Sequence, residues 1–145
     1  MINKIKPVNV LLIEDNPGDI KLIRETFKEN KFLAELTVIT DGEEALNFLK
    51  RMGEFEYELH PDLILLDLNL PKLNGQEILS EIKQDDELKR IPVIVLTSST
   101  EESDIYKSYN LNANCYIAKP VELDDFIKVI RSIENFWLTI VKLPG

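Results

Sequence analysis

Cysteine and histidine are almost absent from this sequence. Among its 145 residues there are one cysteine, Cys115, and one histidine, His60. A single thiol cannot form an internal disulfide, and one thiol plus one imidazole fall short of the usual zinc-binding sets. A bound metal ion is therefore expected to have oxygen ligands. Cys115 is expected to be a small buried side chain rather than a redox switch, and His60, in an irregular stretch, is expected to face solvent.

Positive charge and long apolar runs are also scarce. Lys and Arg number 17 against 26 Asp and Glu, which gives a net charge of -9 at pH 7. Binding to a phosphate backbone requires a basic patch, so nucleic acid is not an expected partner. The apolar runs are far shorter than the ~20 residues needed to span a bilayer, and the opening residues Met1–Pro7 lack the pattern of a secretory signal. We expect a cytoplasmic protein that binds neither nucleic acid nor membranes.

Five short apolar runs alternate with longer segments of helical period. The runs, rich in Val, Ile and Leu, are Val8–Glu14, Leu33–Thr40, Asp62–Leu68, Ile91–Thr97 and Ala113–Ala118. The helical segments are Pro17–Asn30, Asp41–Arg51, Asn74–Gln84, Thr100–Tyr109 and Glu122–Ile140. This alternation is typical of a parallel sheet with helices on both faces. We predict an α/β fold, a flavodoxin-like, doubly wound (βα)5 unit with strand order 2-1-3-4-5.

Polar residues predict where two of these helices begin. Asp41 is followed three residues later by Glu44, and Asn74 by Glu77. This spacing is typical of a capping pair, in which the first side chain binds backbone N–H groups of the first helical turn. We therefore expect Asp41 and Asn74 to be N-cap residues.

Five polar side chains lie at the carboxyl ends of the predicted strands, at one edge of the sheet. In an open parallel sheet, ligands bind beyond the carboxyl ends of the strands, where the strand order reverses. Those ends carry Glu14, Asp15, Asp67, Thr97 and Lys119. Three carboxylates, one hydroxyl and one ammonium group are expected to converge there.

Carboxylates gathered in one pocket repel by about 4 kcal/mol per pair at 4 Å and an effective dielectric of 20, so either their pKa values rise or a cation occupies the pocket. Magnesium fits this need and leaves coordination positions open for phosphate oxygens. Asp67 interrupts an apolar run, where an unpaired charge costs several kcal/mol unless an interaction that the protein needs offsets it. The sequence predicts that Asp67 acts as a nucleophile toward a phosphoryl group, with Mg2+ bound nearby and with Thr97 and Lys119 neutralising the phosphoryl oxygens.

These residues resemble the receiver domain of response regulators in two-component signalling. The matching motifs are LLIEDN, LILLDLNLP followed by Gly75, VIVLTSS and YIAKP. The resemblance covers about Asn9 to Ile133 and implies a single receiver domain over residues 1–145, with an extended C-terminal helix and tail over 134–145.

The resemblance also implies the chemistry of the site. Asp67 would accept a phosphoryl group from a phosphohistidine of a histidine kinase. Mg2+ would be held by Asp15, Asp67 and the backbone carbonyl of Asn69, with Glu14 assisting through water. The protein would be a self-phosphorylating acceptor with slow autodephosphorylation rather than a turnover enzyme.

An output surface is implied by the same resemblance. Tyr116, three residues before Lys119, stands where such receivers carry an aromatic switch coupled to Thr97. The face of the fourth helix, fifth strand and fifth helix would then change its affinity for partners or form a homodimer. More narrowly, the segment EDNPGD, the pair Phe136-Trp137 and the tail Leu143-Pro144 are similar to stand-alone receivers that partner phytochrome-type histidine kinases.

The motifs leave one alternative function open and disfavour three others. A phosphoryl shuttle or sink in a multi-step phosphorelay would use the same residues and stays open. A phosphatase of the haloacid dehalogenase type needs an acid two residues after its nucleophile, where this chain has Asn69. The five glycines form neither the Rossmann nor the phosphate-loop fingerprint. A degenerate receiver used only as a scaffold is disfavoured, because the acidic pair, acceptor, hydroxyl and lysine are all present.

Overall fold

The structure, a computed structural model, describes residues 8–29, 34–53, 60–70, 73–97, 115–119, 122 and 124. In chain order its elements are β1 (Val8–Ile13), α1 (Pro17–Glu29), β2 (Ala34–Ile39), α2 (Gly42–Leu49), β3 (Leu63–Asp67), α3 (Gly75–Gln84), the 3-10 helix η2 (Leu88–Arg90), β4 (Val93–Thr97) and β5 (Cys115–Ala118). The helix predicted over Thr100–Tyr109 and the tail over 134–145 lie outside this described part, as does the helix predicted over Glu122–Ile140 except for residues 122 and 124.

All five strands form one parallel sheet. Their order is β2-β1-β3-β4-β5, which confirms the predicted topology. The order reverses after β1, because β2 pairs with one side of β1 and β3 with the other. Register brings the carboxyl ends level: Asp67 of β3 lies opposite Leu96, and Thr97 of β4 lies opposite Ala118. The residues that follow the strands are therefore held at one edge.

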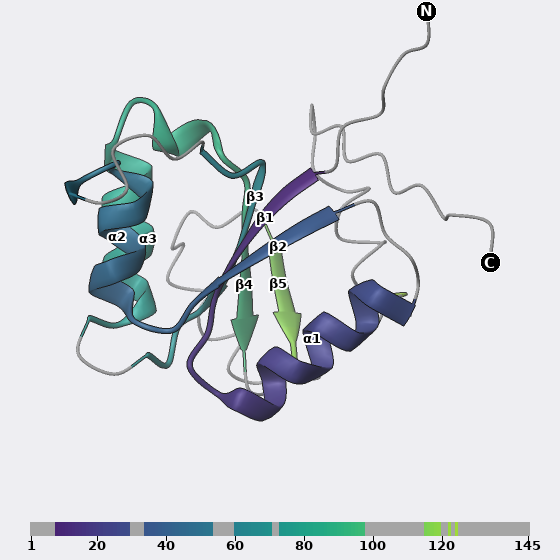
Figure 1. The fold of residues 1–145 in the computed structure, drawn as a ribbon. Helices are drawn as coiled ribbons and strands as arrows, with labels where there is room; N and C mark the ends of the chain where they lie inside the picture. The colour runs from purple at the N-terminus through teal and green to yellow at the C-terminus, as the bar shows by residue number, and fades with distance from the viewer. Residues whose placement is uncertain are drawn as a thin grey trace, which may run out of the picture.

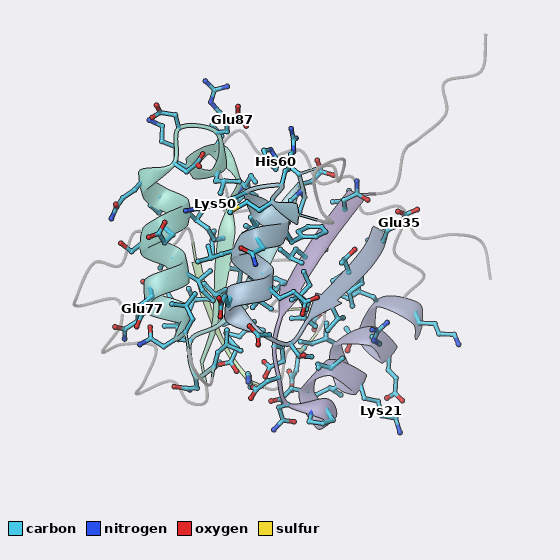
Figure 2. The ribbon with its side chains drawn as sticks, turned by 60° about the vertical axis from the view of Figure 1, so that its left-hand side comes forward. Lys21, Glu35, Lys50, His60, Glu77 and Glu87 are labelled. Atoms are coloured by element: carbon cyan, nitrogen blue, oxygen red, sulfur yellow. The ribbon has the colours of Figure 1, made fainter. Side chains whose placement is uncertain are left out.

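Two apolar layers cover the two faces of the sheet. Successive residues of a strand point to opposite faces, so Leu11 belongs to one core cluster and Leu12 to the other. Helices α2 and α3 pack on the first face, and α1 packs on the second through Ile23 and Phe27 (Figure 1). Helices on both faces were predicted, and this arrangement confirms them. Charged residues such as Lys21 of α1 and Glu77 of α3 project outward (Figure 2).

Side-chain caps fix where the helices begin. The Asp41 carboxylate accepts the N–H of Glu43 at 2.8 Å and of Glu44 at 3.1 Å. Asn74 accepts the N–H of Glu77 at 3.0 Å, so both predicted N-caps are confirmed. Helix α1 begins in a way that was not predicted: Asn16 Oδ1 accepts the N–H of Asp19 at 3.0 Å. The intervening Pro17 fits because the first helical position needs no N–H donor.

The structure departs from the predictions around the ends of α2 and α3. Helix α2 ends at Leu49 rather than Arg51, because Arg51 adopts a left-handed conformation with φ 55°. The 3-10 helix η2 was not predicted; Asp85 supports it by accepting the N–H groups of Glu87 and Leu88. The prediction for His60 was wrong. Its ring is half-buried, with Nε2 3.1 Å from the Leu49 carbonyl oxygen, since the last carbonyls of a helix lack partners within it.

In the part of the chain that the structure describes, every helix is too short or too polar to cross a lipid bilayer.

Candidate functional site

The chain leaves β1 through two acidic residues that differ in exposure. Glu14 is completely buried, whereas Asp15 is exposed. The Glu14 N–H donates to the carbonyl of Ile39 at 3.2 Å, which carries the pairing with β2 one residue further. Its Oε1 accepts the N–H of Asn16 at 3.2 Å. Backbone groups on both sides thus hold the Glu14 side chain inward.

Asp67 ends β3 with its carboxylate almost fully buried, at 3% exposed. Its Oδ1 accepts the N–H of Asn69 at 3.0 Å, which turns the carboxylate across the end of the strand. The backbone of Gly75 lies directly against this turn, and its N–H donates to the Leu68 carbonyl at 3.1 Å. A carboxylate oxygen from each of Glu14, Asp15 and Asp67 lies within 4.8 Å of the other two. The predicted convergence of the three acids is therefore found.

Lys119, which follows β5, reaches into this acidic cluster. Its Nζ lies 2.8 Å from Glu14 Oε2, 3.0 Å from Asp19 Oδ2 and 3.5 Å from Asp67 Oδ2. The contact with Glu14 is an ion pair without the direction of a hydrogen bond, whereas the contact with Asp19 has hydrogen-bond geometry. The lysine side chain is 16% exposed, so solvent screens these contacts only in part.

The pKa values of two site residues, Glu14 and Lys119, are shifted from their usual values. Burial raises the pKa of Glu14 to about 7, and Asp67 adds to this rise while Lys119 opposes it. Burial acts to lower the pKa of Lys119, but the carboxylates of Glu14, Asp19 and Asp67 outweigh it and raise that pKa. The ammonium group therefore keeps its charge at neutral pH, and Glu14 can gain or lose a proton there.

Of the other predicted site residues, Thr97 and Asn69 lie at the same edge of the sheet, and Tyr116 lies on β5 three residues before Lys119. Thr97 is the last residue of β4 and lies level with Ala118 of β5, although its side chain is outside the described part. Asn69 is exposed two residues after Asp67. Tyr116 is half-buried on β5 and packs against the core cluster on the α2 and α3 face. The side chain of Cys115 is not described.

Sequence reasoning missed Asp19 as part of this site. The residue lies in the first turn of α1, where an acidic side chain is ordinarily explained by the positive end of the helix. Its contact with Lys119 joins residues 100 positions apart. The available signal was spacing: Asp19 comes four residues after Asp15, so a helix starting at Pro17 turns it back toward the end of β1.

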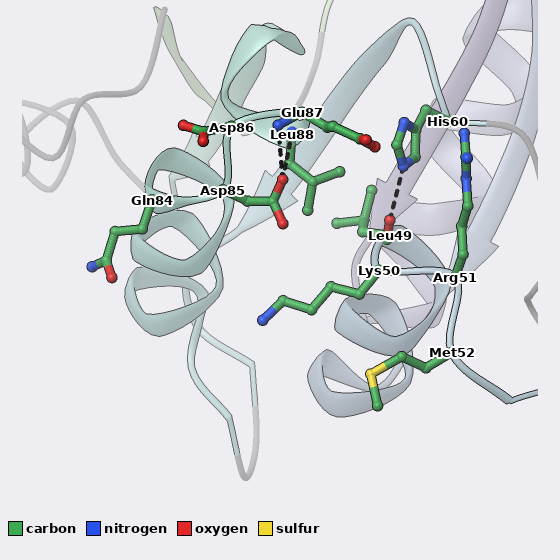
Figure 3. A pocket seen from close by; sticks show the side chains of 10 residues that line it. All are labelled: Leu49, Lys50, Arg51, Met52, His60, Gln84, Asp85, Asp86, Glu87 and Leu88. Carbon is green, nitrogen blue, oxygen red and sulfur yellow. Dashed lines mark hydrogen bonds between the residues drawn. The ribbon is translucent and has the colours of Figure 1, made fainter.

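A second hollow, of about 630 Å³, lies at the other end of α2 and α3 (Figure 3). It is lined by Leu49, Lys50, Arg51, Met52, His60, Gln84, Asp85, Asp86, Glu87 and Leu88. Several of its polar groups serve the fold. Asp85 accepts the N–H groups of Glu87 and Leu88 at the start of η2, and His60 contacts the end of α2. Lys50 Nζ lies 2.7 Å from Glu81 Oε2, which ties the end of α2 to α3. The acidic cluster remains the better candidate site.

A parallel sheet with acids directly after β1 and at the end of β3, and with a lysine directly after β5, defines a class of signalling domain. The chain belongs to the response regulator receiver domain family, which matches residues 10–131. The predicted family and fold are thereby confirmed.

Individual relatives match over nearly the full chain. Response regulator Rcp1 of Synechocystis sp. is 49% identical over 139 residues, 96% of this chain and 95% of Rcp1. The structure of its Mn2+-bound form has a TM-score of 0.73 at 48% identity and covers 96% of this chain and 100% of that one.

Two further structures are of phytochrome response regulators. Bacteriophytochrome response regulator RtBRR has a TM-score of 0.85 at 40% identity, covering 96% of this chain and 84% of that chain. The phosphorylated cyanobacterial phytochrome response regulator RcpA has a TM-score of 0.74 at 46% identity, covering 96% and 99%. The chain is thus a response regulator of the receiver type, similar to the regulators that accompany phytochromes.

Proposed function

We propose that Asp67 accepts a phosphoryl group from a phosphohistidine of a histidine kinase. The observation that carries this proposal is the position of the Asp67 carboxylate: buried, at the end of β3 opposite Leu96 of β4, and 3.5 Å from the ammonium group of Lys119. The similarity of the chain to RcpA, whose structure is that of a phosphorylated protein, supports the assignment. In the transfer, an oxygen of Asp67 bonds to phosphorus as the P–N bond breaks and the histidine nitrogen keeps the electron pair.

The donor set also fits a bound Mg2+ ion. Glu14, Asp15 and Asp67 offer hard oxygen ligands within 4.8 Å of one another, and Lys119 alone leaves the cluster with excess negative charge. Asp15, Asp67 and the backbone carbonyl of Asn69 would hold the ion, with Glu14 assisting through water. A Mn2+-bound form of the related Rcp1 supports a divalent cation here. When bound, such an ion neutralises charge that develops on phosphoryl oxygens.

The protein's own side chains have separate roles in this proposal. Asp67 Oδ1 is occupied by the N–H of Asn69, so Oδ2, which faces Lys119, is the oxygen assigned to phosphorus. Lys119 and the hydroxyl of Thr97 would bind phosphoryl oxygens. Asn69, small, polar and exposed, leaves room for the water that slowly hydrolyses the acyl phosphate.

Output is assigned to the surface around β5. Tyr116 packs on the same core cluster as Val95 of the adjacent β4, two residues before Thr97, and can respond when Thr97 shifts toward a phosphoryl group. A homodimer through this face and a phytochrome-type kinase as donor belong to the same proposal, supported by similarity to RtBRR and RcpA. Family membership also supports action in the cytoplasm, where such kinases present their phosphohistidine.

The test is phosphorylation of purified protein by acetyl phosphate with Mg2+, followed by intact mass. Wild type should gain one acid-labile phosphoryl group, and Asp67→Asn should gain none. Asp86→Asn is the matched control, because Asp86 is exposed and pairs with Lys89 in the same stretch of chain. It should be labelled like wild type. If Asp67→Asn is labelled as fully as wild type, the acceptor assignment is wrong.

A further inference from the structure

Lys119 contacts the carboxylate of Asp19 as well as that of the proposed acceptor, Asp67. Its Nζ lies nearer to Asp19 Oδ2, at 3.0 Å, than to Asp67 Oδ2, at 3.5 Å. Glu14, the third contact at 2.8 Å, is buried at the centre of the site. Asp19 reaches the lysine from outside the sheet, with a side chain that is 29% exposed. The cation assigned to the phosphoryl group is thus shared with helix α1.

The start of α1, where Asp19 lies, is already stabilised without Lys119. Asn16 and Pro17 form the start of α1, and the Asp19 N–H is already satisfied by Asn16. A carboxylate in the first turn is also stabilised by the positive end of the helix itself. The Asp19–Lys119 contact therefore adds a link between α1 and the end of β5 that neither element requires in order to form.

The link must change when the acceptor is modified. An ammonium group has three N–H donors and strongly prefers the acceptor with the greatest negative charge. In the acyl phosphate, the single charge of Asp67 is replaced by a phosphoryl group carrying close to two. The bond to phosphorus uses Asp67 Oδ2, which frees one donor of Lys119, and the lysine can bind more than one phosphoryl oxygen only by giving up Glu14 or Asp19 as well. Asp19 is the partly exposed member, so its contact is the one that water replaces at least cost.

We propose that Asp19 is a positioning residue that competes with the phosphoryl group for Lys119. The contact holds the lysine toward α1 in the unmodified protein and so slows phosphorylation. It also makes the start of α1 sensitive to phosphorylation, because Asp19 is released when Lys119 turns to the acyl phosphate. This inference rests on the proposed function of Asp67.

The test compares Asp19→Asn with Glu25→Gln. Glu25 is on the same helix and loses the same charge, but pairs with Lys21 at 4.0 Å on the exposed face. With acetyl phosphate and saturating Mg2+ at low ionic strength, Asp19→Asn should raise the initial rate of labelling about fivefold, the most that a partly exposed ion pair usually contributes. Glu25→Gln should leave the rate unchanged, and Asp19→Glu should restore it toward wild type.

A double-mutant cycle with Lys119→Met separates competition from a general effect of charge. If Asp19 acts through the lysine, Asp19→Asn has no effect in the Lys119→Met background. The same gain in both backgrounds would mean that Asp19 merely repels the anionic donor, and a rate at or below wild type in the single variant would mean that it does not compete. Either result overturns the inference. Asp19→Ser, which also suits a first helical turn, repeats the measurement if the asparagine variant does not fold.

The Asp67→Asn protein distinguishes this failure from failure of the proposed function. Labelling of that variant at the wild-type level would remove the acceptor and the inference together. An unlabelled Asp67→Asn protein, with Asp19→Asn no faster than wild type, would remove only the role of Asp19.

Discussion

Gly75 is the position at which a single added carbon should disturb the acceptor. A Cβ built on Gly75 would lie 2.5 Å from the carbonyl oxygen of Asp67, closer still to Leu68 Cα, and 2.8 Å from Leu68 Cδ2. Two of these atoms belong to the backbone and cannot rotate away. Replacement of Gly75 by alanine must therefore move the start of α3 away from the end of β3.

The cost follows from two opposing effects. Overpacking of this kind destabilises proteins by about 1 to 3 kcal/mol. Alanine regains up to ~1 kcal/mol of helix propensity over glycine, and less here because Gly75 is the first residue of its helix. We expect Gly75→Ala to lower the free energy of unfolding by about 1 to 2 kcal/mol, and the Tm by about 2 to 8 °C. Because the crowded oxygen belongs to Asp67 itself, the rate of labelling by acetyl phosphate should fall as well.

Urea unfolding followed by circular dichroism measures the stability, and intact mass after acetyl phosphate treatment measures the labelling. Gly18→Ala is the matched control, since its added Cβ meets only the side-chain oxygen of Asn16, at 3.2 Å. That variant should stay within about 0.5 kcal/mol of wild type. A Gly75→Ala protein as stable and as readily labelled as wild type would show that α3 does not press against the acceptor turn, and the argument from close approach would fail.

Two further predictions concern the charges of the site. Lys119→Ala leaves two buried carboxylates without their cation and should cost about 3 kcal/mol in EDTA. Calorimetric titration should still detect Mg2+ binding, while the response of partners to phosphorylation is lost; an unchanged response would remove Lys119 from the switch. In EDTA, the raised pKa of Glu14 means that the folded state binds more protons than the unfolded state between about pH 4.5 and about 7, so stability should fall as pH rises through this window. Glu14→Gln should flatten that slope, and an equally steep slope in the variant would contradict the assignment.

Much of the fold could be predicted because its signals are local. Continuous apolar runs identified the buried strands, and the pairs beginning at Asp41 and Asn74 identified two helix starts. The edge that carries the site followed from topology alone, since parallel strands bring their carboxyl ends together. Asp67 was predictable for a further reason: a charge at the end of an otherwise apolar strand costs free energy, and this points to a role at the site.

What the sequence did not predict depends on contacts between distant segments. His60 is half-buried beside the carbonyl oxygen of Leu49, at the end of another element, and no pattern around His60 reveals this contact. Likewise, Asp19 resembles any acidic residue in a first helical turn until Lys119 lies beside it. Adjacent Glu14 and Asp15 also appear equivalent in the sequence, yet one is buried and the other exposed. That difference arises because side chains alternate as the chain leaves β1.

The balance of charge explains why two of these misses, Asp19 and the burial of Glu14, fall at the site. Four carboxylates, those of Glu14, Asp15, Asp19 and Asp67, share one described cation, Lys119. A close pair of like charges costs about 4 kcal/mol at 4 Å and an effective dielectric of 20, so one ammonium group cannot compensate all of them. The protein relieves part of the excess by raising the pKa of Glu14. In the function proposed above, a divalent cation would relieve more, and only then would a phosphoryl group, which adds negative charge, become favourable. The surplus of acid would thus make phosphorylation depend on the metal, and Asp19 would set how readily Lys119 is released to the phosphoryl group.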